Sequence, residues 1–317
     1  MIDVTVTRKH LEAEGIFTFE LARVDGGTLP PFSAGSHVDV HLPNGLVRQY
    51  SLYNHPDEHH RYLIGVLLDP SSRGGSQGMH ELVTEGSLLR ISEPRNLFPL
   101  AHGAQRSLLF AGGIGITPIL CMAERLAQIG ANFQVHYCSR SPARTAFVGR
   151  MQDADFADRV SFHFDDQGDE QKLNVGQILA EYAEGDHLYV CGPGGFMAFV
   201  LAAAQAAGWP EKSLHREYFS AEPQVHTNDG SFDVQLASSG RSFHIPADRS
   251  VADVLLDAGV DLPLSCEQGI CGTCLTRVLE GEPDHRDMFL TSEEQARNDQ
   301  FTPCCSRARS PRLVLDL

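Results

Sequence analysis

The chain has 317 residues, of which 42% are hydrophobic and 21% charged, a globular composition long enough for two or three domains. Its 25 Lys and Arg against 41 Asp and Glu give a formal net charge of −16, which disfavours nucleic acid and anionic membranes as partners because both require a basic surface. The start, MIDVTVTRKHLEAEG, lacks the apolar segment of a signal peptide, and no apolar run reaches the roughly 18 residues that span a bilayer. We therefore expect a cytoplasmic protein.

Residues 1–102 are predicted to form a small closed β-barrel. Short alternating or apolar runs separated by turn signals such as PNG and DPSSRGG are typical of such barrels. One short helix is expected from Ser76, directly after the glycines of RGGSQG. The runs that predict strands are FTFEL, HVDVHL, LVRQYSLYN and RYLIGVLLD.

Residues 103–222 change to an alternation of strands and helices, which predicts a parallel α/β sheet with ligand sites at the carboxyl ends of its strands. SLLFAG, FQVHYCS and HLYVCG are the expected strands, and FMAFVLAAAQAAG is an expected helix. Another helix should begin near Pro118, which suits a first turn, and should stop at Gly130. Its apolar stripe consists of Ile119, Met122, Ala123 and Leu126.

Residues 223–230 have the composition of a linker, and residues 231–317 are predicted to form an α+β domain. SFDVQL and RSFHIP are expected to pair as a hairpin. Ser250 should cap a helix that ends at Gly259, and another capped helix should begin near Ser292. The strands LTRVLEG and RLVLDL complete this domain.

Five of the eight cysteines lie in this last domain, in a pattern that predicts a metal centre in a reducing compartment. Cys266, Cys271 and Cys274 have the spacing C-x4-C-x2-C, and Cys304 and Cys305 follow at a distance. This is the plant-type [2Fe–2S] spacing, in which four thiolates bind two irons. The residues alone leave either Cys304 or Cys305 as the fourth ligand.

Two other metal centres fit the cysteines less well. Structural zinc sites usually repeat C-x2-C pairs, so the x4 gap disfavours zinc. A Rieske centre replaces two Cys ligands by His, and no Cys-x-His pair occurs here. Gly269 and Gly272 allow the backbone to fold tightly around a cluster and to direct N–H groups at its sulfurs.

The run Arg48-Gln49-Tyr50-Ser51 resembles the R-x-Y-S flavin-binding strand of the ferredoxin-reductase superfamily. Arg48 would then bind a phosphate, Tyr50 would cover a flavin face, and the Ser51 hydroxyl would lie near the reactive N5. The resemblance also includes Val66 among the flavin-binding residues. R-x-Y-S alone is a weak signal, because Arg and Tyr are ordinary on a half-exposed strand.

A second signal for the flavin is the loop RGGSQG. Gly74, Gly75 and Ser76 open the expected helix, whose free N–H groups and dipole suit a phosphate. The simpler interpretation is a plain turn before a helix. Together with R-x-Y-S, the loop favours a flavin phosphate site.

Two further loops resemble the nucleotide-binding loops of the same superfamily. GGIGITP is a poor generic dinucleotide motif, because Pro118 holds the position of its last glycine. The resemblance assigns Gly113 and Gly115 to the pyrophosphate and Thr117 to the contact between flavin and nicotinamide. The second loop, Cys191-Gly192-Pro193, would place the Cys191 thiol beside the nicotinamide, although a buried core thiol is an alternative role.

An aromatic residue stacks on the flavin in this superfamily, and Phe219 is the candidate here, with Tyr218 as the competing choice. The strand ending HYCSR has no terminal acid to hold a ribose 2′-hydroxyl, and Arg140 there suits a 2′-phosphate. NADH is therefore expected from the resemblance and not from Arg140.

These motifs, in this order and over essentially the whole chain, resemble the phthalate dioxygenase reductase family. The resemblance implies an FMN-binding barrel, an NAD-binding domain and a plant-type ferredoxin domain of β-grasp fold. It also selects Cys304 as the fourth cluster ligand, by alignment from the C-terminal end. FMN is preferred to FAD because many FAD-containing relatives carry the ferredoxin domain first.

The resemblance further implies the activity of an NADH-dependent iron-sulfur flavoprotein oxidoreductase. Electrons would pass from NADH through FMN and the [2Fe–2S] cluster to the separate component of a Rieske-type oxygenase, with Ser51, Thr117 and Cys191 as the residues closest to the chemistry. The alternatives are a stand-alone reductase of soluble acceptors and a reductase for phthalate, carnitine or other oxygenases. A redox sensor or a carrier ferredoxin would leave the first 220 residues unexplained.

Overall fold

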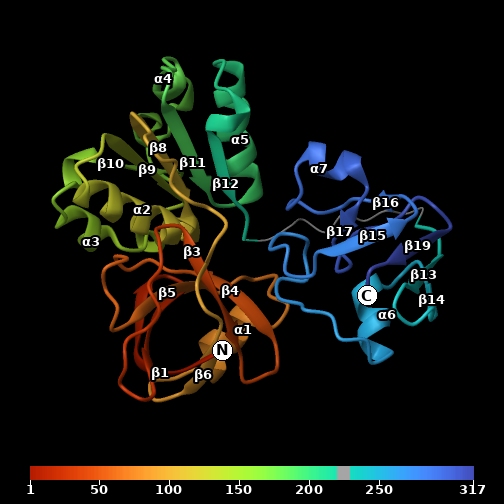
Figure 1. The fold of residues 1–317 in the computed structure, drawn as a ribbon. Helices are drawn as coiled ribbons and strands as arrows, with labels where there is room; N and C mark the ends of the chain where they lie inside the picture. Colours follow the sequence, from red (N-terminus) through yellow and green to blue (C-terminus); the bar gives the residue numbers. More distant parts are fainter. Residues whose placement is uncertain (220–228) are drawn as a thin grey trace. The chain divides into compact units, whose positions relative to one another are not determined.

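The structure is a computed structural model that describes residues 1–219 and 229–317. The chain divides into two compact units, residues 1–219 and 220–317, whose elements are labelled in Figure 1. Of the predicted linker at 223–230, only Asp229 and Gly230 lie within the described residues. The Asp229 carboxylate accepts hydrogen bonds of 2.8 and 2.5 Å from the Arg286 guanidinium.

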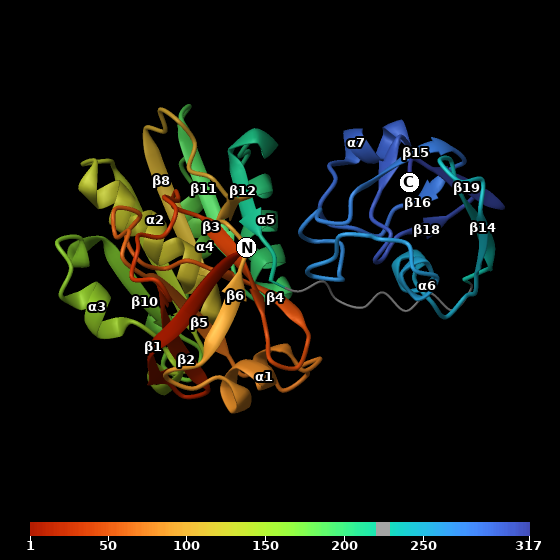
Figure 2. The same ribbon diagram turned by 60° about the horizontal axis from the view of Figure 1, so that its bottom comes forward.

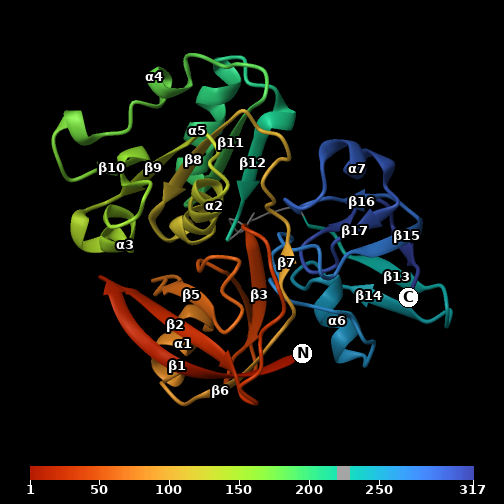
Figure 3. The same cartoon turned by 60° about the vertical axis from the view of Figure 1, so that its left-hand side comes forward.

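Seven antiparallel strands of the first unit form one sheet, in the order β4-β3-β6-β1-β2-β5 with β7 paired to β3. A bridge between Leu52 and Ile64 joins the two edges of the sheet, so the predicted barrel is confirmed (Figure 3). The barrel elements are β1 (Ile2–Ala13), β2 (Ile16–Arg23), β3 (Ser36–His41), β4 (Val47–Ser51), β5 (Tyr62–Leu67), α1 (Gly75–Leu82), β6 (Leu88–Ile91) and β7 (Arg95–Asn96).

Strand β1 is not among the predicted strands, although its first residues alternate in polarity. Ile2, Val4 and Val6 are buried in the barrel core, while Asp3 is exposed and Thr5 is half-buried. Successive side chains of a strand point to opposite faces, so this alternation places one face inward. The predicted strand LVRQYSLYN is shorter than expected and ends at Ser51.

The predicted α/β sheet is also confirmed. Its five strands are parallel and lie in the order β10-β9-β8-β11-β12. Helices α2 and α3 pack on one face, and α4 and α5 pack on the other. The elements are β8 (Arg106–Gly112), α2 (Ile116–Gln128), β9 (Phe133–Ser139), α3 (Val148–Gln152), β10 (Val160–Phe164), α4 (Val175–Leu179), β11 (Asp186–Cys191), α5 (Gly194–Ala206) and β12 (Leu214–Glu217).

Helix α2 follows its sequence pattern closely. Pro118 lies in its first turn, and Gly130 follows its end with a left-handed φ of 65°. The four residues of the predicted stripe are all buried against the sheet. Since a helical stripe of this spacing must face a core, the amphipathic pattern alone predicted the orientation of α2.

The barrel and the parallel sheet share one hydrophobic core within the first unit. The Cys121 thiol of α2 donates a hydrogen bond of 3.2 Å to the Asn54 carbonyl oxygen. The ring of Tyr53 lies 4.5 Å from that of Phe147. These contacts cross position 102/103, the predicted domain boundary, and they bring the barrel next to the loops of the α/β sheet.

The second unit contains a mixed five-stranded sheet in the order β14-β13-β19-β15-β17 and a small two-stranded sheet of β16 and β18. Helix α6 packs on the larger sheet (Figure 2) and begins with a capping box formed by Ser250 and Asp253. The elements are β13 (Phe232–Leu236), β14 (Ser242–Ile245), α6 (Val251–Asp257), β15 (Thr276–Glu280), β16 (Pro283–Asp284), α7 (Ser292–Arg297), β17 (Gln300–Phe301), β18 (Arg307–Ala308) and β19 (Arg312–Leu315).

Within residues 1–219 and 229–317, every helix is too short or too polar to cross a bilayer.

Candidate functional site

The predicted phosphate-binding residues of the barrel come together at the start of α1. Gly74 precedes this helix in a left-handed conformation with φ of 82° and has no side chain to cap it, and the Ser72 hydroxyl accepts a 3.4 Å hydrogen bond from the Gln77 amide of the first turn. A Cβ atom on Gly75 would lie 2.7 Å from the side chain of Arg48. Strand β4 therefore places the Arg48 side chain directly over the helix N-terminus, and a guanidinium beside the N–H groups of a first helical turn suits an anion.

The other residues of this loop and strand hold that arrangement in place. The Arg48 guanidinium donates hydrogen bonds to the carbonyl oxygens of Val47 and Arg73, at 2.7 and 3.3 Å. The Ser76 hydroxyl accepts a hydrogen bond of 3.1 Å from the backbone of Asp69. Burial raises the pKa of the Tyr50 phenol, so this ring stays neutral.

Val66 lies in β5, beside α1. Its side chain is buried, and its carbonyl oxygen accepts a 2.9 Å hydrogen bond from His80 Nε2 of α1. In the same strand, a Cβ atom on Gly65 would lie 3.0 Å from the Thr117 methyl group of α2. Strand β5 therefore connects the two predicted sites, because it contains Val66 of the flavin site and contacts Thr117 of the nucleotide loop.

The two predicted nucleotide loops meet at the carboxyl ends of the neighbouring strands β8 and β11. Gly113 has a left-handed φ of 53°. A Cβ atom on Gly115 would overlap the carbonyl oxygen of Cys191, and one on Gly192 would lie 2.8 Å from Gly112 Cα. The loops thus touch backbone to backbone, which only glycine permits, and they form the edge where parallel sheets bind their ligands.

The thiol of Cys191 is fully buried at the end of β11. Burial, together with the nearby Glu217 carboxyl, raises the pKa of this thiol well above its usual value. Cys191 is therefore a neutral thiol, and it belongs to the hydrophobic core that the barrel and the sheet share. The expected role beside a nicotinamide and the core role are compatible with this position.

One residue of this site was missed by the sequence analysis. Ser51 Oγ lies 3.1 Å from Glu217 Oε2, and Glu217 Oε1 lies 3.9 Å from His37 Nδ1. Burial raises the pKa of Glu217 to about 8 although the hydrogen bond from Ser51 opposes this shift. A buried carboxyl that has a raised pKa and contacts the predicted flavin serine is a candidate functional group. Its only sequence signal was its place in Glu217-Tyr218-Phe219.

The two candidate aromatic residues differ in exposure. The side chain of Phe219 is 42% exposed, whereas Tyr218 packs against the core below α5. An exposed ring is available to a ligand, and this favours Phe219. Pro193 packs near Gly112, whose Cβ atom would lie 2.9 Å from Pro193 Cδ, and Arg140 is exposed after β9.

In the second unit, the four predicted cluster ligands form two pairs of thiols. Cys274 Sγ lies 3.3 Å from Cys304 Sγ, and the thiols of Cys266 and Cys271 are within hydrogen-bonding reach of each other. A zinc site needs four ligands on one ion, whereas a [2Fe–2S] cluster needs thiolates on two irons. The donor set therefore fits the cluster.

Backbone N–H groups of the cysteine loop point at its sulfurs. The amides of Gln268 and Ile270 each lie 3.4 Å from Cys266 Sγ, and the amide of Thr273 lies 3.4 Å from Cys271 Sγ. Gly269 and Gly272 have left-handed φ values of 71° and 65°, and side chains there would overlap Cys305 and Phe289. Hydrogen bonds to sulfur of this kind offset the negative charge of a cluster.

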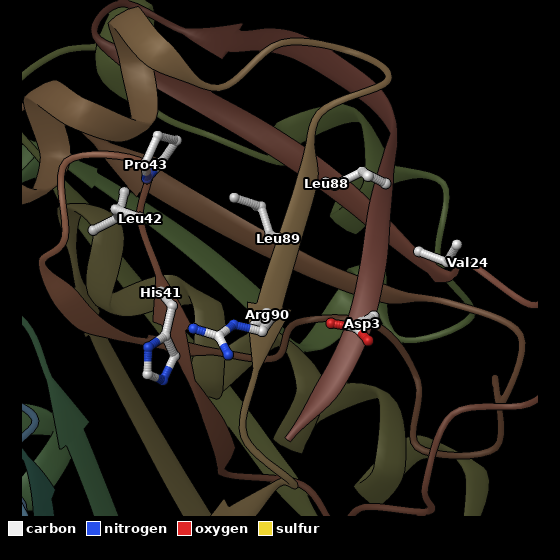
Figure 4. Close-up of a pocket in the computed structure, with 8 residues that line it drawn as sticks. All are labelled: Asp3, Val24, His41, Leu42, Pro43, Leu88, Leu89 and Arg90. Carbon is white, nitrogen blue, oxygen red and sulfur yellow. The ribbon is translucent and has the colours of Figure 1, made fainter.

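A pocket of about 430 Å³ in the barrel part of the chain has none of these residues in its lining (Figure 4). Its lining comes mainly from β1, β3 and β6 and includes Asp3, His41, Leu88 and Arg90.

Two family models match this chain, one within each of its two compact units. A family model described as "2Fe-2S iron-sulfur cluster binding domain" matches residues 234–309, and one described as "Dimethylamine monooxygenase subunit DmmA-like, N-terminal domain" matches residues 92–214. Together with the paired thiols and the joined nucleotide loops, the match defines an iron-sulfur oxidoreductase with a reductase portion and a ferredoxin domain.

Two relatives and one solved structure resemble the chain over its full length. It is 60% identical to "Vanillate O-demethylase oxidoreductase" of Pseudomonas sp. (strain HR199 / DSM 7063) and 63% identical to the protein of that name from Pseudomonas putida, each over 100% of both chains. The structure is phthalate dioxygenase reductase, described as modular for electron transfer from pyridine nucleotides to [2Fe-2S], with 39% identity, a TM-score of 0.79 and coverage of 100% and 98%. The chain belongs to the phthalate dioxygenase reductase family.

Proposed function

We propose that this chain is the reductase component of a two-component vanillate O-demethylase. It would take electrons from NADH and pass them through FMN and the [2Fe–2S] cluster to a separate oxygenase of the Rieske type. The observation that carries the proposal is the identity of at least 60% to two vanillate O-demethylase oxidoreductases, which extends without loss of coverage across both units.

The first unit would hold FMN in the barrel and NADH at the edge of the parallel sheet. Arg48 and the first turn of α1 would bind the FMN phosphate, because they present a cation and free N–H groups to one point. The proposed cofactor-binding residues are Arg48, Tyr50, Ser51, Val66, Gly74, Gly75, Ser76, Gly113, Gly115, Thr117, Cys191, Gly192, Pro193 and Phe219. The proposed cluster ligands are Cys266, Cys271, Cys274 and Cys304.

When bound, the cofactors supply a two-electron donor, a flavin that exchanges one or two electrons, and a one-electron carrier. The residues of the chain supply position and electrostatics. Ser51, Thr117 and Cys191 lie on elements that converge on the barrel–sheet boundary, so a flavin in the barrel and a nicotinamide at the sheet edge would share them. The neutral Glu217 and the neutral Cys191 thiol keep net negative charge away from this site.

The partner would present a positively charged surface, because this chain carries a formal net charge of −16. Reduced thiols and NADH are features of the cytoplasm, where we place the protein.

The proposal is tested by reconstitution with a purified vanillate oxygenase component. We expect NADH consumption to rise severalfold when both the oxygenase and vanillate are added, with release of formaldehyde from the O-methyl group. The oxygenase components of phthalate and carnitine systems, each with its own substrate, serve as controls. NADH oxidation that no oxygenase stimulates would indicate a stand-alone reductase of soluble acceptors.

A further inference from the structure

A row of polar side chains leads away from Ser51 along the outer face of strands β3 and β4, opposite the face that Val38 and Val40 turn to the barrel core. In the antiparallel pair, His37 is opposite Ser51 and Asp39 is opposite Gln49. Residues two apart on a strand share a face, so all four side chains lie on one side of the sheet. Strand β7 adds Arg95, which is opposite His37. None of these residues except Ser51 belongs to the proposed cofactor site.

The hydrogen bonds of this row fix the tautomer of His37. Gln49 Nε2 lies 3.0 Å from Asp39 Oδ1 and 3.4 Å from His37 Nε2. A carboxylate accepts hydrogen bonds and cannot bond to an amide oxygen, so the NH₂ group of Gln49 faces Asp39. The second proton of this NH₂ group is directed at His37. His37 Nε2 must then accept, and a neutral His37 carries its proton on Nδ1. Arg95 holds Asp39 from the other side, with 2.7 Å between its guanidinium and Oδ2.

The proton on Nδ1 faces the buried carboxyl of Glu217. The side chains of His37 and Glu217 are only 4% and 12% exposed, and 3.9 Å separates Nδ1 from Oε1. Burial, assisted by Arg95, lowers the pKa of His37 to about 4, and burial raises that of Glu217 to about 8. Both groups are therefore neutral at pH 7.

Charged and titratable groups from several strands face this pair of side chains. Glu217 of β12 faces His37 of β3 and Cys191 of β11, together with the hydroxyl of Ser51. His37 also faces the opposed charges of Asp39 and Arg95. The Arg95 side chain is 37% exposed, so the Asp39–Arg95 ion pair extends from His37 and Glu217 to the protein surface.

We propose that His37 is a positioning residue that decides which oxygen of Glu217 carries the carboxyl proton. The 3.9 Å between Nδ1 and Oε1 is too long for a hydrogen bond, but the positive end of the N–H dipole lies on the side of Oε1 and disfavours a proton there, so the proton is placed on Oε2. From Oε2, Glu217 donates this proton to Ser51 Oγ. If Glu217 were ionised, the direction would be the opposite, with the Ser51 hydroxyl donating to the carboxylate. The Ser51 hydroxyl proton is then free to be donated to a ligand beside the barrel, which under the proposed function is the flavin.

The tautomer of His37 is measurable without any substitution. In the full chain labelled with ¹⁵N-histidine, the nitrogen chemical shifts of His37 should be those of the Nδ1–H form, with His37→Asn used to assign the signals. Gln49→Leu removes the donor to Nε2 and should move His37 towards the Nε2–H form. A wild-type His37 in the Nε2–H form would overturn the proposal.

The carboxyl is followed separately by infrared titration, with Glu217→Gln identifying its band. His37→Phe should raise the pKa of Glu217 by about one unit, because an N–H directed at a carboxylate favours the charged form. His37→Asn keeps an N–H donor and should restore the wild-type value. His41→Phe, in the same strand but beyond Asp39, is the matched control. An unchanged pKa in His37→Phe would overturn the proposal.

The same shift should appear in the pH profile of flavin reduction by NADH, because a one-unit rise in pKa raises the neutral fraction of Glu217 at pH 8 from about one half to about nine tenths, just under a twofold change in rate. This readout depends on the proposed function, whereas the tautomer and the carboxyl titration do not. If the wild-type protein does not oxidise NADH, the proposed function fails, and the two spectroscopic measurements still decide the role of His37.

Discussion

Cys274 Sγ and Cys304 Sγ lie 3.3 Å apart, although 30 residues of chain separate them. The neighbouring Cys305 also touches Cys304, but its thiol is engaged by the Thr302 and Ser306 hydroxyls at 3.2 and 3.8 Å. The geometry therefore favours Cys304 as the partner of Cys274, which is the choice that the family resemblance also makes.

Cys304→Ser and Cys305→Ser are expected to behave differently. The first removes a cluster ligand, so iron and the visible cluster absorption should be lost. The second should leave both near wild-type levels, because Thr302 and Ser306 can hold the serine hydroxyl in place of the thiol. Iron analysis of the two purified variants measures this. The reverse pattern would make Cys305 the ligand.

Cys271→Ser tests whether the two units work as separate modules. The Cys271 thiol pairs with that of Cys266 within the second unit, which has none of the residues of the barrel or the parallel sheet. Electron delivery to an oxygenase should be abolished, while NADH-dependent reduction of a dye that accepts electrons from the flavin should continue. Both activities are measured on the same preparation. Loss of dye reduction would contradict this modular interpretation.

Arg48→Ala should weaken FMN binding. A charge-assisted hydrogen bond contributes about 1.5–3 kcal/mol, so the dissociation constant should rise roughly 10- to 100-fold. Flavin content after gel filtration and fluorescence titration of the flavin-free protein both measure it. Arg90→Ala is the control, because Arg90 is exposed on β6 and lines the separate pocket of Figure 4. Equal affinity in both variants would remove Arg48 from the phosphate site.

Gly115→Ala should disturb the nucleotide edge of the sheet. The added Cβ would overlap the Cys191 carbonyl oxygen, a backbone atom that cannot rotate away. Overpacking of this kind costs about 1–3 kcal/mol, and the separated loops should bind NADH more weakly. Gly149→Ala is the control, because its Cβ would meet nothing within 4 Å. Thermal unfolding and the KM for NADH measure the two effects.

Glu217→Gln should make the first unit more stable at neutral and alkaline pH. The unfolded carboxyl loses its proton above its ordinary pKa of 4.5, whereas the folded one keeps it up to about pH 8. The folded state therefore binds an extra proton in this window, and its stability falls as pH rises. The neutral amide avoids this cost, which is on the order of 3 kcal/mol at pH 7.

The fluorescence of Trp209, the single tryptophan, reports unfolding of the first unit. The advantage of Glu217→Gln over the wild type should vanish near pH 4 and grow towards pH 8. Glu170→Gln, at an exposed position, should show no such trend. A difference that is constant with pH would mean that Glu217 is ionised in the folded protein.

Features that depend on local sequence were predictable here. The stripe of α2 and the stop at Gly130 follow from periodicity and from a residue that adopts positive φ. The capping box at Ser250 is likewise a short-range pattern. The cysteine spacing predicted the metal centre because its first three ligands lie within nine residues.

The environment of Ser51 could not be predicted in this way. Ser51 and Glu217 are 166 residues apart, and His37 reaches the same point from a third strand. Only the closure of the barrel and its packing against the parallel sheet bring them together, and no spacing rule encodes such a contact. Gln49, in the middle of the R-x-Y-S motif, looked like a variable position, yet its amide orients His37.

The two thiol pairs differ in the length of chain they connect. Cys266 and Cys271 belong to one loop, whereas Cys274 and Cys304 are 30 positions apart in the sequence, so iron bound to this second pair would also be a cross-link. By analogy with a disulfide, closing such a loop stabilises the fold by about 3–4 kcal/mol. Chains made without iron would then lose a large part of the stability of the ferredoxin domain and become targets for proteases. A cell short of iron would eliminate this protein instead of accumulating an inactive form of it.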